Sequence, residues 1–264
     1  MSLSYLFRLI KGDRPKIEKY AYSGLNRPHT VDKNSFEGLF WEHEGTIVHK
    51  WHHYLPIYEK CLSKYKNKPI KFLEIGVSQG GSLSLWRKYF GPDATIYGVD
   101  IDPRCKVYDG VDAQVRIGSQ DDANFMSGVV QEMGEVDIVL DDGSHVSKHI
   151  RSTFNTVFPL LNDGGVYIVE DLHATYWSTY GGGYQSSKSF LSDISQMYDD
   201  MHHWYHSYGQ KISSAKDKLM AIHLYDSMAV FEKKLRSIAN TVKDNFIKKY
   251  ILEYFLGKIA ELTP

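Results

Sequence analysis

Five short apolar runs occupy the middle of the chain, and each is followed by Gly, Asp or Pro and then by a stretch with a helical pattern. Nearly continuous apolar character, as between Asp137 and Leu140, is typical of a strand that is buried on both faces. Strands that alternate with helices predict a parallel sheet with helices on both sides. The predicted strands are Ile70–Ile75, Thr95–Asp100, Ala113–Ile117, Val136–Asp141 and Val166–Glu170.

The pattern changes after these five runs. Two further strand-like runs, Leu219–Leu224 and Met228–Glu232, are separated only by residues 225–227, which permits a hairpin but not a helical crossover. Five parallel strands followed by an antiparallel hairpin resemble the class I methyltransferases rather than the six-stranded parallel sheet of a dehydrogenase. We therefore predict an α/β fold with the Rossmann-like, seven-stranded sheet of a class I S-adenosylmethionine-dependent methyltransferase, together with an N-terminal helical cap.

The segments around this sheet predict one catalytic domain with additions. A chain of 264 residues, 42% of them hydrophobic, can bury one full core. We expect residues 1–68 to form an N-terminal cap that is helical from about Gly45 to Lys66, and residues 69–264 to form the methyltransferase domain. Residues 172–218 are a long insertion with glycine and aromatic residues, which predicts a lid. A last amphipathic helix is expected at about Thr241–Leu262.

Charge and cysteine content restrict the partners and the location that we expect. Lys and Arg number 31 and Asp and Glu number 32, giving a net charge of -1, so the overall charge does not attract nucleic acid or an anionic membrane. Two cysteines are too few for a disulfide framework. Arg8 interrupts the apolar N-terminal stretch, which therefore cannot be a signal-peptide core, and no later run is long enough to span a bilayer. We expect a cytoplasmic homo-oligomer with a small-molecule partner.

The first predicted strand ends in a glycine-containing turn that runs from Glu74 to Ser82 and leads into a helix. Glycine lets the backbone approach a ligand closely, as at the switch point of an open α/β sheet. Gly76, Gly80 and Gly81 do not fit the spacing G-x-G-x-x-G, so the turn alone is a weak signal. The alternative is a tight strand-to-helix turn without a ligand.

The second and third predicted strands end in polar residues that suit a nucleoside. Asp100 ends the second strand, and a carboxylate about 20 to 25 residues after the glycine turn can accept hydrogen bonds from both ribose hydroxyls. NAD and S-adenosylmethionine both contain this ribose, so Asp100 does not distinguish them. Ser119, Gln120 and Asp121 follow the third strand, where an adenine edge would lie. The alternative there is an ordinary polar turn.

Acidic residues cluster at the ends of the fourth and fifth predicted strands. Neighbouring strands lie about 4.8 Å apart, so Asp142, Glu170 and Asp171 can converge on one cation. Three adjacent carboxylates without a cation would repel each other, and at least one would take up a proton. Oxygen ligands favour a hard ion such as Mg²⁺. Since adjacent strand residues point to opposite faces, Glu170 and Asp171 can share an ion only if the strand has already turned. The alternative is that these acids cap helices or solvate a turn.

His145 lies three residues after Asp142, on the loop that would face the cation. The pKa of a sugar or alcohol hydroxyl lies far above neutral. A bound metal lowers the pKa of a ligated oxygen, and a neutral imidazole can accept the released proton. His145 is therefore the predicted general base. The alternative is a loop histidine that is hydrogen-bonded to an acid.

These motifs resemble those of the sugar O-methyltransferases of macrolide biosynthesis, the group of mycinamicin VI 2''-O-methyltransferase and macrocin O-methyltransferase, and of the related cephalosporin hydroxylase family. The resemblance runs from Phe72 to about Trp177 and resumes from His223 to Glu232. It is carried by L-E-I-G-V-x-x-G-G-S-L, G-x-D-I-D-P, I-G-S-Q, D-I-V-L-D-D-G-S-H and V-E-D-L-H-A-T-Y-W. Ordered motifs over more than half of the chain make the resemblance specific.

The resemblance implies a Mg²⁺ site at Asp142, Glu170 and Asp171, a base at His145, and S-adenosylmethionine as methyl donor. The expected function is O-methylation of a hydroxyl on a sugar or a glycosylated natural product. Tyr176 and Trp177 are expected to cover the acceptor. The residues expected at the S-adenosylmethionine site are Glu74, Gly76, Ser78, Gly80, Gly81, Ser82, Asp100, Asp102, Ser119, Gln120, Asp121 and Asp141.

Three alternatives remain open at the level of the sequence. A metal-dependent oxygenase of the cephalosporin hydroxylase type would bind Fe(II) through two histidines and one carboxylate, for which His145, His173 and Asp142 are available. A catechol-type O-methyltransferase has a similar spacing between its metal carboxylates and its base. A non-catalytic partner of a methyltransferase would keep the fold without the chemistry.

Overall fold

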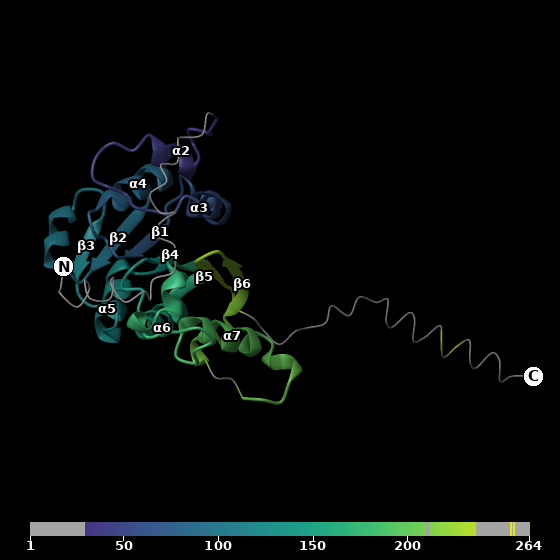
Figure 1. Cartoon of the computed structure of the whole chain (residues 1–264). Helices are drawn as coiled ribbons and strands as arrows, with labels where there is room; N and C mark the ends of the chain where they lie inside the picture. Colours follow the sequence, from purple (N-terminus) through teal and green to yellow (C-terminus); the bar gives the residue numbers. More distant parts are fainter. Residues whose placement is uncertain (1–29, 210–211, 236–253, 255, 257–264) are drawn as a thin grey trace, which may run out of the picture.

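A seven-stranded sheet forms the centre of the molecule (Figure 1). The computed structural model describes residues 30–209, 212–235, 254 and 256. The strand order is β3-β2-β1-β4-β5-β7-β6, in which β1 to β5 are parallel and β7 is antiparallel to both of its neighbours. The predicted parallel sheet with a C-terminal antiparallel hairpin is therefore confirmed. The strands are β1 (Lys71–Ile75), β2 (Thr95–Asp100), β3 (Gln114–Ile117), β4 (Val136–Asp141), β5 (Leu161–Val169), β6 (Leu219–Tyr225) and β7 (Met228–Lys233).

Helices cover both faces of the sheet, above and below it in the view of Figure 1. Successive side chains of β1 alternate between the two faces: Phe72 belongs to one hydrophobic cluster, and Leu73 and Ile75 belong to the other. Burial on both faces explains why the strands read as continuous apolar runs. The first cluster contains residues of α2 (Phe36–Trp41), α3 (Tyr54–Leu62) and α4 (Gly81–Phe90), and the second contains residues of α5 (Ala123–Met133), α6 (Ser147–Val157) and α7 (Phe190–Met201).

Strand β5 differs most from its prediction. It begins at Leu161, five residues before the predicted start, and its pairing with β4 shifts register between Val136 and Ile138. The irregular start contains Gly164, whose φ of 84° is unusual in a strand. In the sequence this segment therefore resembles a turn more than the start of a strand. The strand ends at Val169, one residue early, so Glu170 and Asp171 lie beyond it.

The N-terminal segment is less helical than predicted. Between Gly45 and Lys66, only residues 54–62 form an α-helix, followed by a 3-10 turn at Ser63–Tyr65, so the expectation of a helix from about Gly45 was wrong. Residues 46–48 are all β-branched, which disfavours a helix. Helix α3 buries Tyr54 and Tyr58 in the first cluster, so this segment is packed into the same core as the sheet.

The predicted insertion, residues 172–218, has two structurally different parts. Its first part consists of 3-10 turns at Leu172–Tyr176 and Ser178–Tyr180, next to the carboxyl end of the sheet. Its second part contains α7, which buries Phe190, Ile194 and Met197 in the second cluster. Helix α7 is therefore a core element and not a lid. Further 3-10 turns lie at Pro103–Tyr108, Phe158–Leu160, His203–Tyr205 and Ser213–Ala215.

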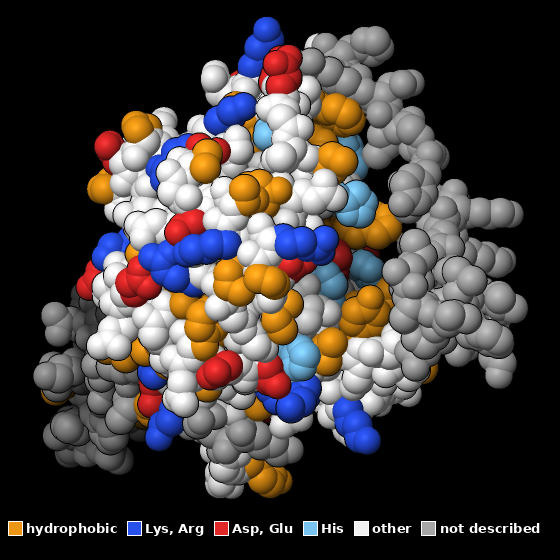
Figure 2. All heavy atoms as spheres, turned by 90° about the vertical axis from the view of Figure 1, so that its left-hand side faces the viewer, with side chains coloured by type: hydrophobic (Ala, Val, Ile, Leu, Met, Phe, Trp, Pro, Cys, Tyr) orange, Lys and Arg blue, Asp and Glu red, His pale blue; other side chains and the backbone are white. Residues whose placement is uncertain are grey.

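Two further predictions concern the C-terminal helix and membrane-spanning segments. The last helix, expected at about Thr241–Leu262, lies outside the described residues except at Tyr254 and Leu256. In the part of the chain that the structure describes, no helix combines the length and hydropathy that a membrane span requires. Figure 2 shows acidic, basic and apolar side chains interspersed over one face of the molecule.

Candidate active site

The crevice at the carboxyl end of the sheet lies where the strand order reverses, between β1 and β4. The loops after these two strands touch there. Gly76 has a φ of 99°, and a Cβ atom on it would lie 2.1 Å from the main-chain oxygen of Asp142. Only glycine permits this approach. Gly76 therefore joins the predicted cofactor turn to the predicted metal loop.

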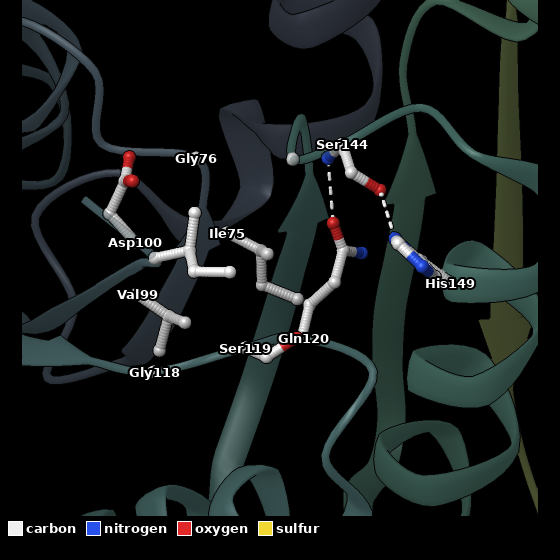
Figure 3. A pocket seen from close by; sticks show the side chains of 11 residues that line it. Ile75, Gly76, Val99, Asp100, Gly118, Ser119, Gln120, Ser144 and His149 are labelled. Atoms are coloured by element: carbon white, nitrogen blue, oxygen red, sulfur yellow. Dashed lines mark hydrogen bonds between the residues drawn. The ribbon is translucent and has the colours of Figure 1, made fainter. Parts of the chain in front are cut away.

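A cavity of about 190 Å³ opens beside Gly76, between the ends of β1, β2, β3 and β4. We call this cavity the donor pocket, because it contains residues that the sequence predicts at the methyl-donor site: Asp100 lies at one end, and Gln120, Ser144 and His149 lie at the other (Figure 3). The Gln120 Oε1 atom accepts a hydrogen bond of 2.6 Å from the Ser144 amide, and the Ser144 hydroxyl lies 2.9 Å from His149 Nδ1. The donor pocket thus pairs a carboxylate with a polar far end, as a nucleoside requires.

Main-chain amides hold Asp100 in place. Its Oδ2 atom accepts a hydrogen bond of 2.9 Å from the Ser78 amide, and its Oδ1 atom accepts one of 2.8 Å from the Asp102 amide. Ser78 and Asp102 were both predicted at the cofactor site. The Asp102 side chain is turned to its own surface partner, Arg104, at 2.5 Å. Asp102 therefore supports Asp100 mainly through its backbone.

The predicted residue Glu74 lies behind the donor pocket and not on its wall. Its side chain is fully buried beneath α4, where the Ser82 hydroxyl donates to Oε2 at 2.8 Å and the Trp86 indole donates to Oε1 at 3.1 Å. Burial raises the pKa of Glu74 to about 7, although the charge of Lys50 and the hydrogen bond from Ser82 oppose the shift. Glu74 can position the turn but does not border the described cavities.

Asp141, like Glu74, does not line the donor pocket, but it contacts a residue that does. The Gln120 amide donates to its Oδ1 atom at 3.0 Å, and the Tyr167 hydroxyl donates to its Oδ2 atom at 3.0 Å. Burial raises the pKa of Asp141 to about 6, against these two hydrogen bonds. Asp141 therefore orients Gln120, which does line the pocket. Asp121 lies nearby at the surface, 3.2 Å from Lys148.

A second cavity of about 300 Å³ adjoins the donor pocket, and the two share Gly76, Asp100 and Gly143 in their walls. The N-terminal segment closes it from above, because a Cβ atom on Gly81 would lie 2.4 Å from the main-chain oxygen of Thr46. Gly80, at the start of α4, has a φ of 73° and packs against Tyr108. Besides Gly76 and Asp100, the predicted residues that line this second cavity are Ser78, Gly81, Ser82, Asp142, His145 and Asp171.

Asp142, His145 and Asp171 form a cluster in the second cavity. One ligand atom from each lies within 4.8 Å of the other two, and His145 Nε2 is 3.6 Å from Asp171 Oδ2. His145 and Asp171 have φ angles of 57° and 53°, in the left-handed region that non-glycine residues rarely adopt. Such backbone conformations occur often at active sites. Two carboxylates and an imidazole at this spacing fit a single divalent cation.

Glu170, the third predicted metal ligand, is not part of this cluster. Its side chain is 1% exposed, Oε2 accepts a hydrogen bond of 2.8 Å from Lys50, and Oε1 accepts one from the Tyr58 hydroxyl. Burial and the neighbouring Asp142 carboxylate raise the pKa of Glu170, whereas Lys50 and Tyr58 lower it. The chain has turned at Asp171, as a shared ion requires, but the two acids point to different partners.

Residues from the N-terminal segment complete the site, and the sequence reasoning missed them. The Lys50 ammonium donates to Asp142 Oδ2 at 2.5 Å and is only 3% exposed. Burial alone would lower the pKa of Lys50, but the charges of Asp142 and Glu170 raise it well above its usual value. The Tyr54 hydroxyl donates to Asp171 Oδ1 at 2.8 Å. The one sequence signal was the i, i+4 spacing of Tyr54 and Tyr58, which places both on one face of a helix.

Aromatic rings border the cluster on the side of the first 3-10 turns. The Trp177 ring lies 5.1 Å from the His173 ring and 5.8 Å from the Tyr180 ring, and Tyr180 in turn lies 6.5 Å from the His145 ring. Trp51 lies 5.7 Å from His173 and extends this aromatic row. The other predicted substrate residue, Tyr176, is 51% exposed. Trp177 is therefore placed beside the cluster, together with Tyr180 and Trp51, which were not predicted.

Comparison with known proteins identifies the fold and its relatives. Residues 73–172 match the family model of a methyltransferase domain. The chain is 37% identical over 243 residues to 8-demethyl-8-(2-methoxy-alpha-L-rhamnosyl)-tetracenomycin-C 3'-O-methyltransferase of Streptomyces olivaceus, covering 86% of this chain and 60% of that one. It is 32% identical over 200 residues to mycinamicin VI 2''-O-methyltransferase of Micromonospora griseorubida, covering 69% of this chain and 48% of that one.

Among solved structures, the chain is similar to the MycE methyltransferase of the mycinamycin biosynthetic pathway in complex with Mg and SAH, with a TM-score of 0.66 and 29% identity. The match covers 75% of this chain and 54% of that one. The chain therefore spans about half the length of most of the relatives it matches. The predicted class I methyltransferase fold and the predicted resemblance to macrolide sugar O-methyltransferases are confirmed.

Proposed function

We propose that this protein is an S-adenosylmethionine- and Mg²⁺-dependent O-methyltransferase that acts on a hydroxyl of a sugar or of a glycosylated natural product. One observation carries the proposal: the donor pocket and the cavity of the acid cluster share the walls formed by Gly76, Asp100 and Gly143. A methyl donor and a metal-dependent acceptor site would thus lie side by side. The names of the relatives, which are O-methyltransferases of rhamnosyl tetracenomycin and of mycinamicin, support the sugar as acceptor.

The donor pocket would hold S-adenosylmethionine, which supplies the methyl group. Asp100 would accept hydrogen bonds from the ribose hydroxyls, since its two oxygens are fixed by the Ser78 and Asp102 amides. Gln120 and Ser144 would face the adenine edge at the other end. The donor pocket would thus contribute to the rate by binding the donor and orienting its methyl group.

Asp142 and Asp171 would hold the Mg²⁺, which lowers the pKa of an acceptor hydroxyl. His145 would accept the proton of that hydroxyl, because its imidazole lies in the same cavity. Asp171 Oδ2, 3.6 Å from His145 Nε2, would stabilise the imidazolium that forms. The Tyr54 hydroxyl holds the other oxygen of Asp171 in place. A ligand atom of His145 also lies within 4.8 Å of an oxygen of each carboxylate, so the three residues could share one cation. The His145 variant should therefore be tested for metal affinity as well as for turnover.

The aromatic row would bind the acceptor. Trp177 and Tyr180 line up toward His145, and Trp51 approaches from the N-terminal segment. Aromatic faces suit the apolar faces of a sugar ring and exclude water from the reaction. This placement supports Trp177 as a substrate residue and gives no such support to the exposed Tyr176.

The cluster argues against the oxygenase alternative. A non-haem Fe(II) site of that kind uses two histidines and one carboxylate, whereas the cluster consists of one histidine and two carboxylates. His173, the second histidine of the alternative, instead has its Nδ1 atom 2.5 Å from the Ser227 hydroxyl. Oxygen consumption with Fe(II) would restore the alternative.

A cytoplasmic location and a homo-oligomeric assembly belong to the same proposal. Strand β6 is at the edge of the sheet and exposes Met220 by 49% and Leu224 by 60%. An exposed apolar edge strand favours a subunit contact. Light scattering on the purified chain would measure the number of subunits, and a monomer at micromolar concentration would count against the assembly.

The proposed activity is tested by transfer of a labelled methyl group from S-adenosylmethionine to a panel of nucleotide sugars, rhamnosides and catechols. We expect label in the sugar fraction, loss of transfer with a chelator, and recovery with Mg²⁺. Label confined to catechols would favour the catechol-type alternative. Binding of S-adenosylmethionine without transfer to any member of the panel would favour the non-catalytic one.

A further inference from the structure

His173 lies in the middle of the aromatic row, and the proposed mechanism does not use it. Its ring is 5.7 Å from the Trp51 ring and 5.1 Å from the Trp177 ring, both in edge-to-face arrangements. It also shares Asp171 with the proposed base: His173 Nδ1 is 3.9 Å from Asp171 Oδ1, and His145 Nε2 is 3.6 Å from Asp171 Oδ2. The two imidazoles therefore flank one carboxylate, and a sugar bound beside His145 lies within reach of His173.

The Nδ1 atom of His173 stands at the end of a chain of short polar contacts. It is 2.5 Å from Ser227 Oγ, which is 2.8 Å from the Tyr54 hydroxyl. That hydroxyl is in turn 2.8 Å from Asp171 Oδ1. Contacts of this length between polar atoms are hydrogen bonds, and each of the three needs one proton.

For a neutral imidazole, only one arrangement of protons satisfies all three contacts. The Asp171 carboxylate accepts and does not donate, so the Tyr54 hydroxyl donates its single proton to it. The Ser227 hydroxyl must then donate to Tyr54, which leaves its oxygen as an acceptor toward His173. The proton of the His173 ring is therefore on Nδ1, and Nε2 is a hydrogen-bond acceptor.

This acceptor has no partner among the described residues, since none of them donates a hydrogen bond to His173 Nε2, and the side chain is 20% exposed. Because the ring is rigid, Nε2 points away from Ser227 when Nδ1 points to it. His53 provides a contrast, because its ring is also near Trp51, at 6.1 Å, but its Nε2 atom is 3.1 Å from the main-chain oxygen of Asp226. The Nε2 atom of His53 is thus occupied as a donor, whereas that of His173 is available to a ligand.

We propose that His173 is a specificity-determining residue, whose Nε2 atom accepts a hydrogen bond from a second hydroxyl of the acceptor sugar, besides the hydroxyl that is methylated. The inference rests on the proposed function and narrows its substrates to sugars that keep this second hydroxyl free. An acceptor without it would cover Nε2 and leave a buried acceptor unsatisfied, which is costly. A site that pairs with a hydroxyl therefore discriminates against an analogue that lacks it.

The test compares transfer of a labelled methyl group to methyl α-L-rhamnoside and to its monodeoxy analogues. Wild-type kcat/KM should fall about five- to tenfold for the analogue that lacks the hydroxyl bound to His173. This loss should disappear in His173→Asn, which keeps a donor toward Ser227 but has no atom at the position of Nε2. It should disappear also in His173→Phe, which keeps a ring between the two tryptophans. A hydroxyl that acts only on the metal or on the base would give the same loss in the wild type and in both variants, and that result overturns the proposal.

His53→Asn is the matched control, because the Nε2 atom of His53 is already occupied, and this variant should discriminate among the analogues as the wild type does. The affinity for Mn²⁺, measured by calorimetry without donor or acceptor, should stay within about threefold of the wild type in His173→Asn, since the bond from Tyr54 to Asp171 is kept. A loss of about tenfold or more would show that His173 acts on the metal site through Asp171. Such a loss overturns the proposal.

The position of the ring proton can be measured without turnover, and this measurement decides the matter even if a variant does not fold. In ¹⁵N-labelled wild-type protein at about pH 8, where an imidazole is neutral, the nitrogen chemical shifts of His173 should show a proton on Nδ1 and none on Nε2. A proton on Nε2 overturns the proposal.

The transfer experiments distinguish failure of this inference from failure of the proposed function. If the wild type transfers label to no sugar, the proposed function falls and the inference falls with it. If the wild type transfers label and His173→Asn discriminates among the analogues as the wild type does, only the inference is overturned.

Discussion

The donor pocket and the acid cluster adjoin in one crevice, but they differ in the kinds of residue that form them. The donor pocket is lined by residues at the ends of β1 to β4 and in the loops that follow them, and five of its eleven lining residues are glycine or serine. The acid cluster consists of the side chains of Asp142, His145 and Asp171, and Lys50 and Tyr54 of the N-terminal segment hold its two carboxylates. In the proposed function, binding of the donor would thus depend on the shape of the loops, whereas turnover would depend on the placement of charges.

This difference predicts that variants in the donor pocket and variants in the acid cluster, the two halves of the site, have separable effects. A change of charge in the acid cluster should reduce turnover and leave binding of the donor intact. A change of shape in the donor pocket should weaken binding of the donor and leave turnover intact. Variants that mix the two effects would show that the halves are coupled through their shared walls.

The largest effect is expected for His145→Ala. Loss of a general base should lower kcat by about 10²- to 10⁴-fold, while the Kd for S-adenosylhomocysteine should stay within about twofold, because His145 lies outside the donor pocket. Transfer kinetics and calorimetry measure the two quantities. His149→Ala is the matched control, since His149 lines the donor pocket. Near-normal turnover would remove His145 as the base, and a tenfold loss of Mn²⁺ affinity would make it a ligand instead.

The next effect is a pH dependence of stability that originates at Glu74, which is buried behind the donor pocket. Burial raises its pKa from 4.5 to about 7. The folded protein then keeps a proton that the unfolded chain has released, so stability falls as the pH rises from about 4.5 to 7. At about 1.4 kcal/mol per pKa unit, the wild type should lose about 3 kcal/mol between pH 5 and pH 8 relative to Glu74→Gln.

Urea unfolding at the two pH values measures this loss. The exposed Glu135→Gln is the control and should follow the wild type. Equal pH dependence of the Glu74→Gln variant and the wild type would mean that Glu74 titrates normally and that its burial is compensated.

A somewhat smaller effect is expected for Gly76→Ala. The new Cβ would lie 2.1 Å from the Asp142 main-chain oxygen, so the two loops must separate. An overpacking cost of about 1–3 kcal/mol should weaken binding of S-adenosylhomocysteine about 5- to 140-fold. Gly110→Ala is a close control, because its φ of 79° is also positive but nothing lies within 4 Å of the added Cβ. Unchanged affinity in Gly76→Ala would mean that loop contact does not shape the donor pocket.

The smallest effect is expected for Trp177→Ala, at the acceptor side of the acid cluster. Loss of one aromatic contact of about 0.5–1.5 kcal/mol should raise KM for the sugar about three- to tenfold, with the affinity for S-adenosylhomocysteine unchanged. Tyr176→Ala, next in the chain but 51% exposed, should leave KM as it is. A larger effect at Tyr176 than at Trp177 would reverse the assignment of the acceptor wall.

The contrast between the two halves also explains what the sequence could predict. Strands β1 to β5 bury both faces and therefore read as apolar runs, and the loops that follow them carry the donor-pocket residues. Asp142, His145 and Asp171 were predictable because β4 and β5 are adjacent and parallel. These features depend on local pattern and on the neighbours in a sheet.

The remaining features depend on contacts between distant parts of the chain. Lys50 contacts Asp142, which is 92 residues away in the sequence, and Glu170, which is 120 residues away. No local sequence pattern predicts such pairs. Glu170 and Asp171 point to different partners because Lys50 and Tyr58 bind Glu170 whereas Tyr54 binds Asp171, and these contacts also join distant parts of the chain. Helix α7 was taken for part of a lid because the sequence does not say which face of the sheet lacks cover.

The central claim is that methyl donor and cation occupy adjoining cavities of one crevice. A crystal structure with S-adenosylhomocysteine and Mn²⁺, recorded at the manganese absorption edge, tests it most directly. We predict an anomalous peak bound by Asp142 and Asp171, with the adenosyl group between Asp100 and Gln120. A manganese ion away from both aspartates, or an adenosyl group outside the donor pocket, would contradict the account.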